Sequence, residues 1–128
     1  MKCGYPGLPS HPQHALMVHL ANQGFGYGGI LDVDLETADR ANELLEILQN
    51  RDRFGLIAVS LGYFDTLMSV SASSTSSELD VAAQHAAHIS PGLARISIGY
   101  TGTVEQRWEQ FEDALRVLDE AMPSRKSG

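Results

Sequence analysis

The sequence has few of the residues that several common kinds of site depend on. Its one cysteine, Cys3, excludes an internal disulfide and favours a reducing compartment, so a cytoplasmic protein is expected. It has only two lysines, Lys2 and Lys126, and both lie near an end of the sequence, where chains are commonly frayed. No apolar run approaches the roughly 18 residues that a membrane-spanning helix needs. With a formal net charge of −7 and a pI of about 5.0, the chain is also a poor partner for nucleic-acid phosphates and for anionic membranes.

What the chain does contain is typical of a globular domain. It has 128 residues and a mass of 13.9 kDa, with 43% hydrophobic and 20% charged residues. A chain of this length is expected to form one domain. Such a domain buries roughly two-thirds of the surface that its unfolded form exposes. We therefore predict a single domain with a substantial hydrophobic core.

The spacing of apolar residues predicts an alternation of helices and strands. Helices are expected over residues 10–22, 37–49, 78–88 and 104–121, and strands over residues 29–35, 54–61, 66–71 and 92–100. The run 54–61 is apolar almost throughout, which is typical of a central strand covered on both faces. The inner order βαββαβ is the pattern of ferredoxin-like domains.

Two of these helices carry apolar stripes that require a common surface. The stripes consist of Ala41, Leu44, Leu45 and Leu48 in the first helix and of Trp108, Phe111, Leu115 and Leu118 in the second. Stripes of this kind pack on one face of a sheet. The sequence thus predicts an α+β domain of two layers, in which helices cover one face of a sheet of about four strands.

Two motifs that can carry chemistry are explained more simply by local structure. Gly24, Gly26 and Gly29 match the G-x-G-x-x-G pattern of dinucleotide-binding loops, which needs a strand before it and a helix after it. Here the expected order is helix and then strand, so a permissive turn is the better interpretation. His85 and His88 have the spacing of a metal-binding pair on a helix, but no suitable third ligand lies close to them in the sequence. We predict no metal site.

One arginine is harder to explain structurally. In the strand 92–100, alternation places Ala94 and Ile96 on one side and Arg95 and Ser97 on the other. A guanidinium removed from water needs an anionic or carbonyl partner. That partner is either an acid elsewhere in this chain or the carboxylate of a ligand, and the residues alone leave both open. In the second case the backbone N–H of Gly62 could join Arg95 in a carboxylate clamp.

Several segments, taken in order, resemble a known family. They are "YPGLPSHPQHAL", "GFGYGGILDVDL", "AVSLGYFDTLM", "SASSTSSELD" and "ISPGLARISIGYTGTVEQRWEQFEDAL". Together they are similar to the C-terminal domain of the pyridoxal-phosphate-dependent enzymes of cysteine and methionine metabolism, which include cystathionine γ-lyases, cystathionine γ-synthases and methionine γ-lyases. The resemblance runs from about Tyr5 to Met122. "SLGYFDTLMS" followed by "SSTSSEL" looks most like the plant methionine γ-lyases, whereas most other members carry a His-Pro-Ala-Ser-Met-Thr-His type of run there.

The resemblance implies a fold and a set of binding residues. Residues 1–122 would be the small C-terminal domain of a fold-type I enzyme, with a mostly antiparallel sheet and helices on one face, and residues 123–128 a disordered tail. Arg95 falls on the arginine that faces the substrate's α-carboxylate, and Ser60 on the serine whose backbone meets the same carboxylate. Thr75 falls on a threonine of the following loop, although it is preceded here by serine where the family usually has methionine. The resemblance assigns no catalytic and no cofactor-binding residue to this chain.

The chain departs from the family by lacking its cofactor half. That half holds pyridoxal phosphate through a Schiff-base lysine, and the chemistry requires such an amine. The resemblance therefore implies the substrate-side domain of a carbon–sulfur lyase of sulfur amino-acid metabolism (the transsulfuration family), inactive alone, which works with a missing cofactor-domain half or a homo-oligomer partner. Two other interpretations remain: a free-standing ferredoxin-like sensor of amino acids, and an interaction domain that docks on a separately encoded partner.

Overall fold

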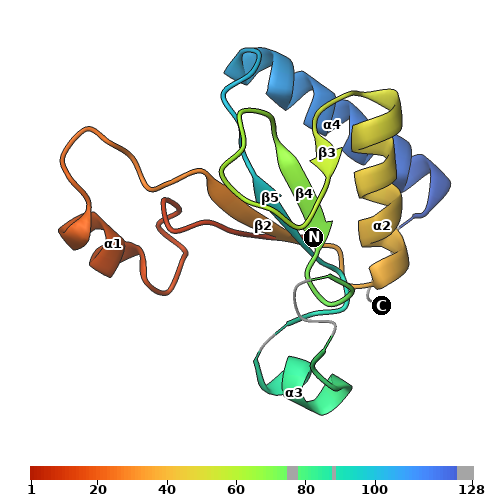
Figure 1. The fold of residues 1–128 in the computed structure, drawn as a ribbon, viewed down its shortest axis with the longest axis horizontal. Coiled ribbons are helices and arrows are strands. Elements are labelled where there is room, and N and C mark those ends of the chain that lie inside the picture. The colour runs from red at the N-terminus through yellow and green to blue at the C-terminus, as the bar shows by residue number, and fades with distance from the viewer. Residues whose placement is uncertain (75–77, 88, 124–128) are drawn as a thin grey trace.

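The computed structural model describes residues 1–74, 78–87 and 89–123. Along the chain it contains β1 (Lys2–Gly4), α1 (His14–Leu20), β2 (Ile30–Asp34), α2 (Ala38–Glu46), a π-helical turn η1 (Ile47–Arg51), β3 (Leu56–Ile57), β4 (Leu67–Val70), α3 (Val81–Ala86), β5 (Leu93–Ser97) and α4 (Val104–Ala121) (Figure 1). None of the helices in these ranges has the length and apolar character that crossing a membrane requires. The tail predicted to be disordered, residues 123–128, lies outside the described residues except for Pro123.

The sheet confirms the predicted α+β class and adds one strand to it. Its five strands lie in the order β1-β2-β5-β4-β3, and every neighbouring pair is antiparallel except β3 and β4, which run parallel. The unpredicted strand is β1, where Cys3 pairs with Val33 of β2. Three residues are too few to show an alternating pattern, so β1 could not be predicted. The prediction that Lys2 lies in a frayed end was wrong, because Lys2 is the first residue of this strand.

The ferredoxin-like interpretation of the element order was wrong. The order βαββαβ is present from β2 to β5, but β5 lies between β2 and β4. In a ferredoxin-like sheet the second and third strands form an antiparallel pair, whereas here the corresponding β3 and β4 are parallel. The order of elements along a chain does not determine the order of strands in a sheet.

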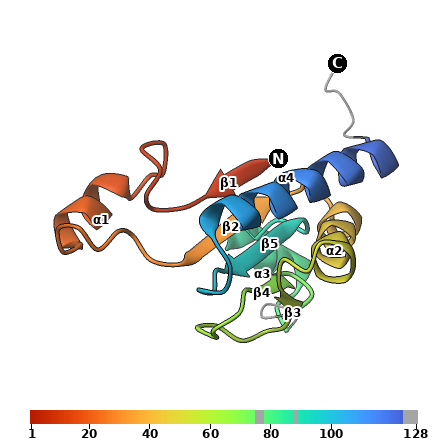
Figure 2. The ribbon, with the colours of Figure 1, turned by 90° about the horizontal axis from the view of Figure 1, so that it is seen from above.

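Helices α2 and α4 cover one face of the sheet, as Figures 1 and 2 show. The two helices begin where threonine side chains cap them: Thr37 Oγ1 accepts from Arg40 N at 3.3 Å, and Thr103 Oγ1 accepts from Gln106 N at 3.1 Å. The core beneath them consists of Val33, Leu35, Ala41, Leu44, Leu45, Ile47, Leu48, Phe54, Met68, Val70, Ala94, Ile96, Ala114 and Leu118. The two layers and the stripe on α2 are therefore confirmed.

The stripe predicted on α4 is displaced from the observed one. Ala114 and Leu118 are fully buried, and Phe111 and Leu115 are partly buried against the core. Trp108, which was predicted to join them, is 58% exposed. It borders a groove between the first turns of α4 and strands β1 and β2 and does not pack into the core.

The prediction of a central strand over residues 54–61 was wrong. Only Leu56 and Ile57 form a strand there, at the edge of the sheet, and both are more than 40% exposed. The strand that is buried throughout is β4, which was expected to be the shorter one. An apolar run shows that a segment avoids water, but it does not show whether the sheet or another surface covers that segment.

Helices α1 and α3 lie outside the two layers. Neither has a buried residue, and α1 projects away from the sheet (Figure 1). Helix α1 also begins later than the expected residue 10, at His14, with Gln13 at its N-cap. The turn that follows α1 is the predicted permissive one, because Gly24 and Gly26 have φ values of 86° and 73°, which other residues rarely adopt.

Candidate functional site

Three polar residues lie side by side on the sheet face opposite α2 and α4. The register pairs Arg95 of β5 with Asp32 of β2 on one side and with Ser69 of β4 on the other. Directly paired residues point to the same face of a sheet. The neighbouring strand residues Ala94 and Ile96 point to the opposite face and are buried in the core, so the alternation predicted for this strand is confirmed.

Asp32 is the nearest acid to Arg95 along the sheet, but it does not neutralise it. None of the ion pairs among the described residues includes Arg95. The Asp32 carboxylate lies against Gly4 of β1, in the space that a side chain at Gly4 would need. Burial raises the pKa of Asp32, and Asp34 raises it further, whereas the charge of His11 and the backbone N–H of Gly4 lower it. The positive charge of Arg95 is thus left without an acid in the described part of the chain.

Arg95 reaches across β4 to the segment that follows β3. Its Nη2 donates a hydrogen bond to the backbone carbonyl of Ser60 at 3.1 Å. Ser60 is exposed, and no group of the described residues bonds to its backbone N–H. The structure therefore brings together two of the three predicted site residues, which are 35 positions apart in the sequence.

The third predicted residue, Thr75, lies outside the described residues. The chain that leads to it turns directly after β4: the hydroxyls of Ser73 and Ser74 both donate to the carbonyl of Val70, at 3.3 and 2.6 Å. His88 also lies outside the described residues, and His85 is exposed on α3. Across the ranges that the structure covers, no three metal-ligating side chains come together.

Gly62, whose N–H was considered as a second donor of the clamp, is engaged elsewhere. Its N–H donates to Oγ of Ser97 at 3.3 Å, and its φ of 69° suits glycine. This bond ties the loop after β3 to the end of β5. Ser60 rather than Gly62 is consequently the backbone group next to Arg95.

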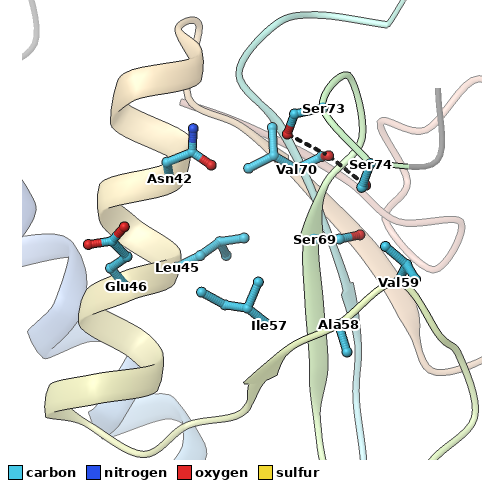
Figure 3. Close-up of a pocket in the computed structure, with 10 residues that line it drawn as sticks. All are labelled: Asn42, Leu45, Glu46, Ile57, Ala58, Val59, Ser69, Val70, Ser73 and Ser74. Carbon is cyan, nitrogen blue, oxygen red and sulfur yellow. Dashed lines mark hydrogen bonds between the residues drawn. The ribbon is translucent and has the colours of Figure 1, made fainter. Parts of the chain in front are cut away.

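A hollow of about 330 Å³ opens beside this site. Figure 3 shows Leu45 on one side of β4 and Ser69 and Val59 on the other, with the Ser69 hydroxyl pointing away from α2. Ser69 is only 2% exposed, and its Oγ has no hydrogen-bond partner. Ser69 was not among the residues predicted for the site, and its signal in the sequence is a serine inside an otherwise apolar strand.

A second arginine, also missed from the sequence, holds the loops at this end of the sheet. Arg107 Nε donates to the carbonyl of Thr101 at 2.9 Å, and Nη1 donates to the carbonyl of Phe54 at 2.9 Å. Its Nη2 pairs with Asp65 at 3.4 Å. Arg107 precedes the partly buried Phe111 by one helical turn. A stripe drawn through Arg107 instead of Trp108 would therefore have predicted the face of α4 that packs on the core.

A groove of about 790 Å³ lies between α4 and strands β1 and β2. Its lining is largely apolar and includes Leu31, Ile98, Tyr100, Trp108 and Phe111. Tyr100 and Trp108 are 84% and 58% exposed. A surface of this kind marks a contact site more often than a free one.

Comparisons with known proteins agree on a single family. The family described as Cys/Met metabolism PLP-dependent enzyme matches residues 1–121. Methionine gamma-lyase of Arabidopsis thaliana is 59% identical over 115 residues, which are 90% of this chain and 26% of that protein. Cystathionine gamma-lyase of Homo sapiens is 34% identical over 118 residues, covering 92% of this chain and 26% of that protein.

A solved structure shows the same architecture. Cystathionine gamma synthase from Xanthomonas oryzae pv. oryzae, in complex with cystathionine, superposes with a TM-score of 0.80 and 29% identity, over 95% of this chain and 30% of that one. The chain thus spans between a quarter and a third of the length of these relatives.

Proposed function

The chain belongs to the Cys/Met metabolism family of pyridoxal-phosphate-dependent enzymes, and from this premise we propose that it is the substrate-side domain of a methionine γ-lyase-like carbon–sulfur lyase. In this role Arg95 and Ser60 bind the α-carboxylate of a sulfur-containing amino acid. Thr75 is retained in the proposal as a third contact. The domain is inactive without the part of the enzyme that holds the cofactor.

The unpaired charge of Arg95 is the observation that carries this proposal. A guanidinium presents up to five donors in a fork that matches a carboxylate, and Arg95 gives one of them to the Ser60 carbonyl. Ser60 is exposed and its N–H has no partner among the described residues, so this N–H can add a donor. A structural arginine in this fold looks different: Arg107 is bonded to three backbone carbonyls and to an acid. Holding the carboxylate in one place would orient the substrate's Cα for the reaction.

The described residues do not fit pyridoxal phosphate itself. The cofactor needs a lysine amine in a setting that lowers its pKa. Lys2 is exposed on the edge strand β1, and Lys126 lies outside the described residues. We therefore assign the cofactor to the remainder of the enzyme, since the relatives are three to four times as long as this chain.

The apolar groove beside α4 is proposed to be the surface on which that remainder packs. The relatives contain a large amount of protein beyond the matched region, and an exposed tryptophan in an apolar groove is stabilised when it is covered. The groove lies on the helical side of the sheet, away from Arg95, so a covering segment leaves the carboxylate site open.

We expect Trp108→Glu to leave the fold of the isolated chain nearly unchanged, with a change in unfolding free energy within about 1 kcal/mol, because the side chain is 58% exposed. Binding of an apolar dye should fall, as measured by fluorescence, and sedimentation velocity checks whether the wild-type chain self-associates. Val81→Glu is the matched control, because Val81 is 84% exposed and lies outside the groove. A tight dimer of the wild-type chain that Trp108→Glu dissociates would instead make a second copy the occupant.

The function itself is tested by fusing residues 1–122 to the part of the Arabidopsis methionine gamma-lyase that precedes the matched region. The chimera, supplied with pyridoxal phosphate, is expected to release a thiol from L-methionine, whereas the 128-residue chain alone releases none.

Treating the chain alone with pyridoxal phosphate and borohydride should label its lysines slowly and without one dominant site. Stoichiometric labelling of a single lysine together with elimination by the isolated chain would contradict the proposal. Calorimetric binding of L-methionine by the chain, combined with an inactive chimera, would favour an amino-acid sensor.

A further inference from the structure

Two buried polar atoms without partners belong to residues that are paired directly across the sheet on the site's face. Among the described residues, Arg95 Nε and Ser69 Oγ are both buried and both lack a hydrogen bond. The register pairs these two residues directly across β5 and β4. Buried polar atoms are nearly always bonded, so two neighbouring exceptions require an explanation.

The chemistry of the two atoms is complementary. A guanidinium Nε–H can only donate, and a serine hydroxyl oxygen can accept. Arg95 has to pass Ser69 to reach Ser60, because β4 lies between β5 and the segment that follows β3. A bond from Nε to Ser69 would satisfy both atoms without any third group.

We propose that Ser69 is a positioning residue, whose hydroxyl accepts the Nε–H of Arg95 when the guanidinium turns to engage a carboxylate. The inference rests on the proposed function, because it concerns how the same clamp is oriented. Ser69 and Ser60 would then hold the guanidinium at two points, one at Nε and one at Nη2.

This arrangement determines which edge of Arg95 meets the substrate. Of the five donors of the guanidinium, Nε–H goes to Ser69 and one Nη2 hydrogen goes to Ser60. The three donors that remain are the two Nη1 hydrogens and one on Nη2. A carboxylate is consequently bound by the terminal nitrogens, and Nε serves only to orient them.

The small size of the Ser69 side chain is part of its proposed positioning role. The side chain of Ser69 is fully covered although it borders the hollow, with only 2% of its surface exposed. A short hydroxyl side chain leaves room for the arginine to cross β4, whereas a longer one would occupy its path. Threonine keeps the hydroxyl with one added methyl group, and alanine removes the hydroxyl without adding bulk.

The test follows the side-chain Nε–H signal of Arg95 by ¹⁵N NMR in the full 128-residue chain, for the wild type, Ser69→Ala and Ser69→Thr. Sodium acetate and L-methionine are the probes, with sodium chloride at equal ionic strength as the control. In the wild type, either carboxylate should shift the Arg95 signal and slow exchange of its Nε–H with water. Arg107 Nε, already bonded to Thr101, is the internal reference that should not respond.

Ser69→Ala should weaken the affinity for both probes about fivefold, the effect of losing one ordinary hydrogen bond, and should abolish the slowing of exchange. Ser69→Thr should remain within about twofold of the wild type. Equal affinity and equal protection in Ser69→Ala would overturn the role of Ser69 while leaving the clamp intact. If no carboxylate shifts Arg95 in the folded wild type, the clamp of the proposed function fails, and the role of Ser69 fails with it.

Discussion

Arg107→Met should lower the free energy of unfolding by about 3 kcal/mol. This is the largest loss of stability that we expect from a substitution in the loops around Thr101, Phe54 and Asp65. The side chain is only 17% exposed and joins three parts of the chain through Thr101, Phe54 and Asp65. Methionine retains the apolar stem but leaves the carbonyls of Thr101 and Phe54 without that donor, and Asp65 without its counter-ion. Denaturant melts of the two chains measure the difference.

Arg116→Met is the matched control on the same helix. Arg116 pairs with Asp113 and Glu120, but it is 58% exposed. Ion pairs in water contribute little, so this substitution should cost far less than Arg107→Met. If the two substitutions lowered the free energy of unfolding equally, the contacts of Arg107 with Thr101, Phe54 and Asp65 would not stabilise the loops.

The elements with a capping residue and a long apolar period could be predicted closely from the sequence. The helix expected over 104–121 is observed over the same residues, because Thr103 caps it and its apolar residues recur over five turns. The helix expected from residue 37 begins at Ala38 for the same reason, although its last turn is the π-helical Ile47–Arg51. These signals are local, and tertiary packing did not override them.

The elements that depend on distant partners could not be predicted in this way. The edge strand β1 forms by pairing with β2, which is distant in the sequence. Strand β3 is short because the chain leaves the sheet after Ile57, and the segment that follows places Ser60 in contact with Arg95. The apolar residues Val59 and Leu61 that follow are exposed here. Their apolar character indicated a buried strand, whereas in this fold they form the surface beside the candidate site.

The candidate site shows the same division. Arg95 could be singled out from the sequence, because a lone arginine in an apolar strand demands a partner. The family resemblance assigned Ser60 to the same substrate carboxylate as Arg95, and the structure places the two residues in contact through Arg95 Nη2 and the Ser60 carbonyl. The sequence marks Ser69 only as a serine inside an apolar strand, and its place beside Arg95 depends on the register of β4 against β5. The role of Thr75 stays a prediction.

Arg95→Leu should affect the stability of the chain far less than Arg107→Met does. A structural ion pair would predict a loss of roughly 3–5 kcal/mol, because removing one partner leaves a buried charge uncompensated. Arg95 has no acid partner among the described residues and a buried Nε without a bond. The change should therefore be close to neutral, or stabilising by roughly 1 kcal/mol, since an unpaired polar group is removed. A loss above about 3 kcal/mol in denaturant melts would make Arg95 a residue of the fold.

In the active chimera, the same Arg95→Leu substitution should lower kcat/KM for L-methionine by roughly 10²-fold or more. The reason is orientation: without the guanidinium, the proposed carboxylate site keeps only the contacts proposed for Ser60 and Thr75, and the substrate samples unproductive poses. Arg116→Leu is the control for removing an arginine, because Arg116 lies on the exposed side of α4 and, within the described part of the chain, bonds only to Asp113 and Glu120. Steady-state kinetics on the three chimeras separate the outcomes. A nearly unchanged free energy of unfolding together with a large fall in kcat/KM would identify Arg95 as a residue that binds the substrate. Unchanged kinetics would instead show that Arg95 is not part of the carboxylate site.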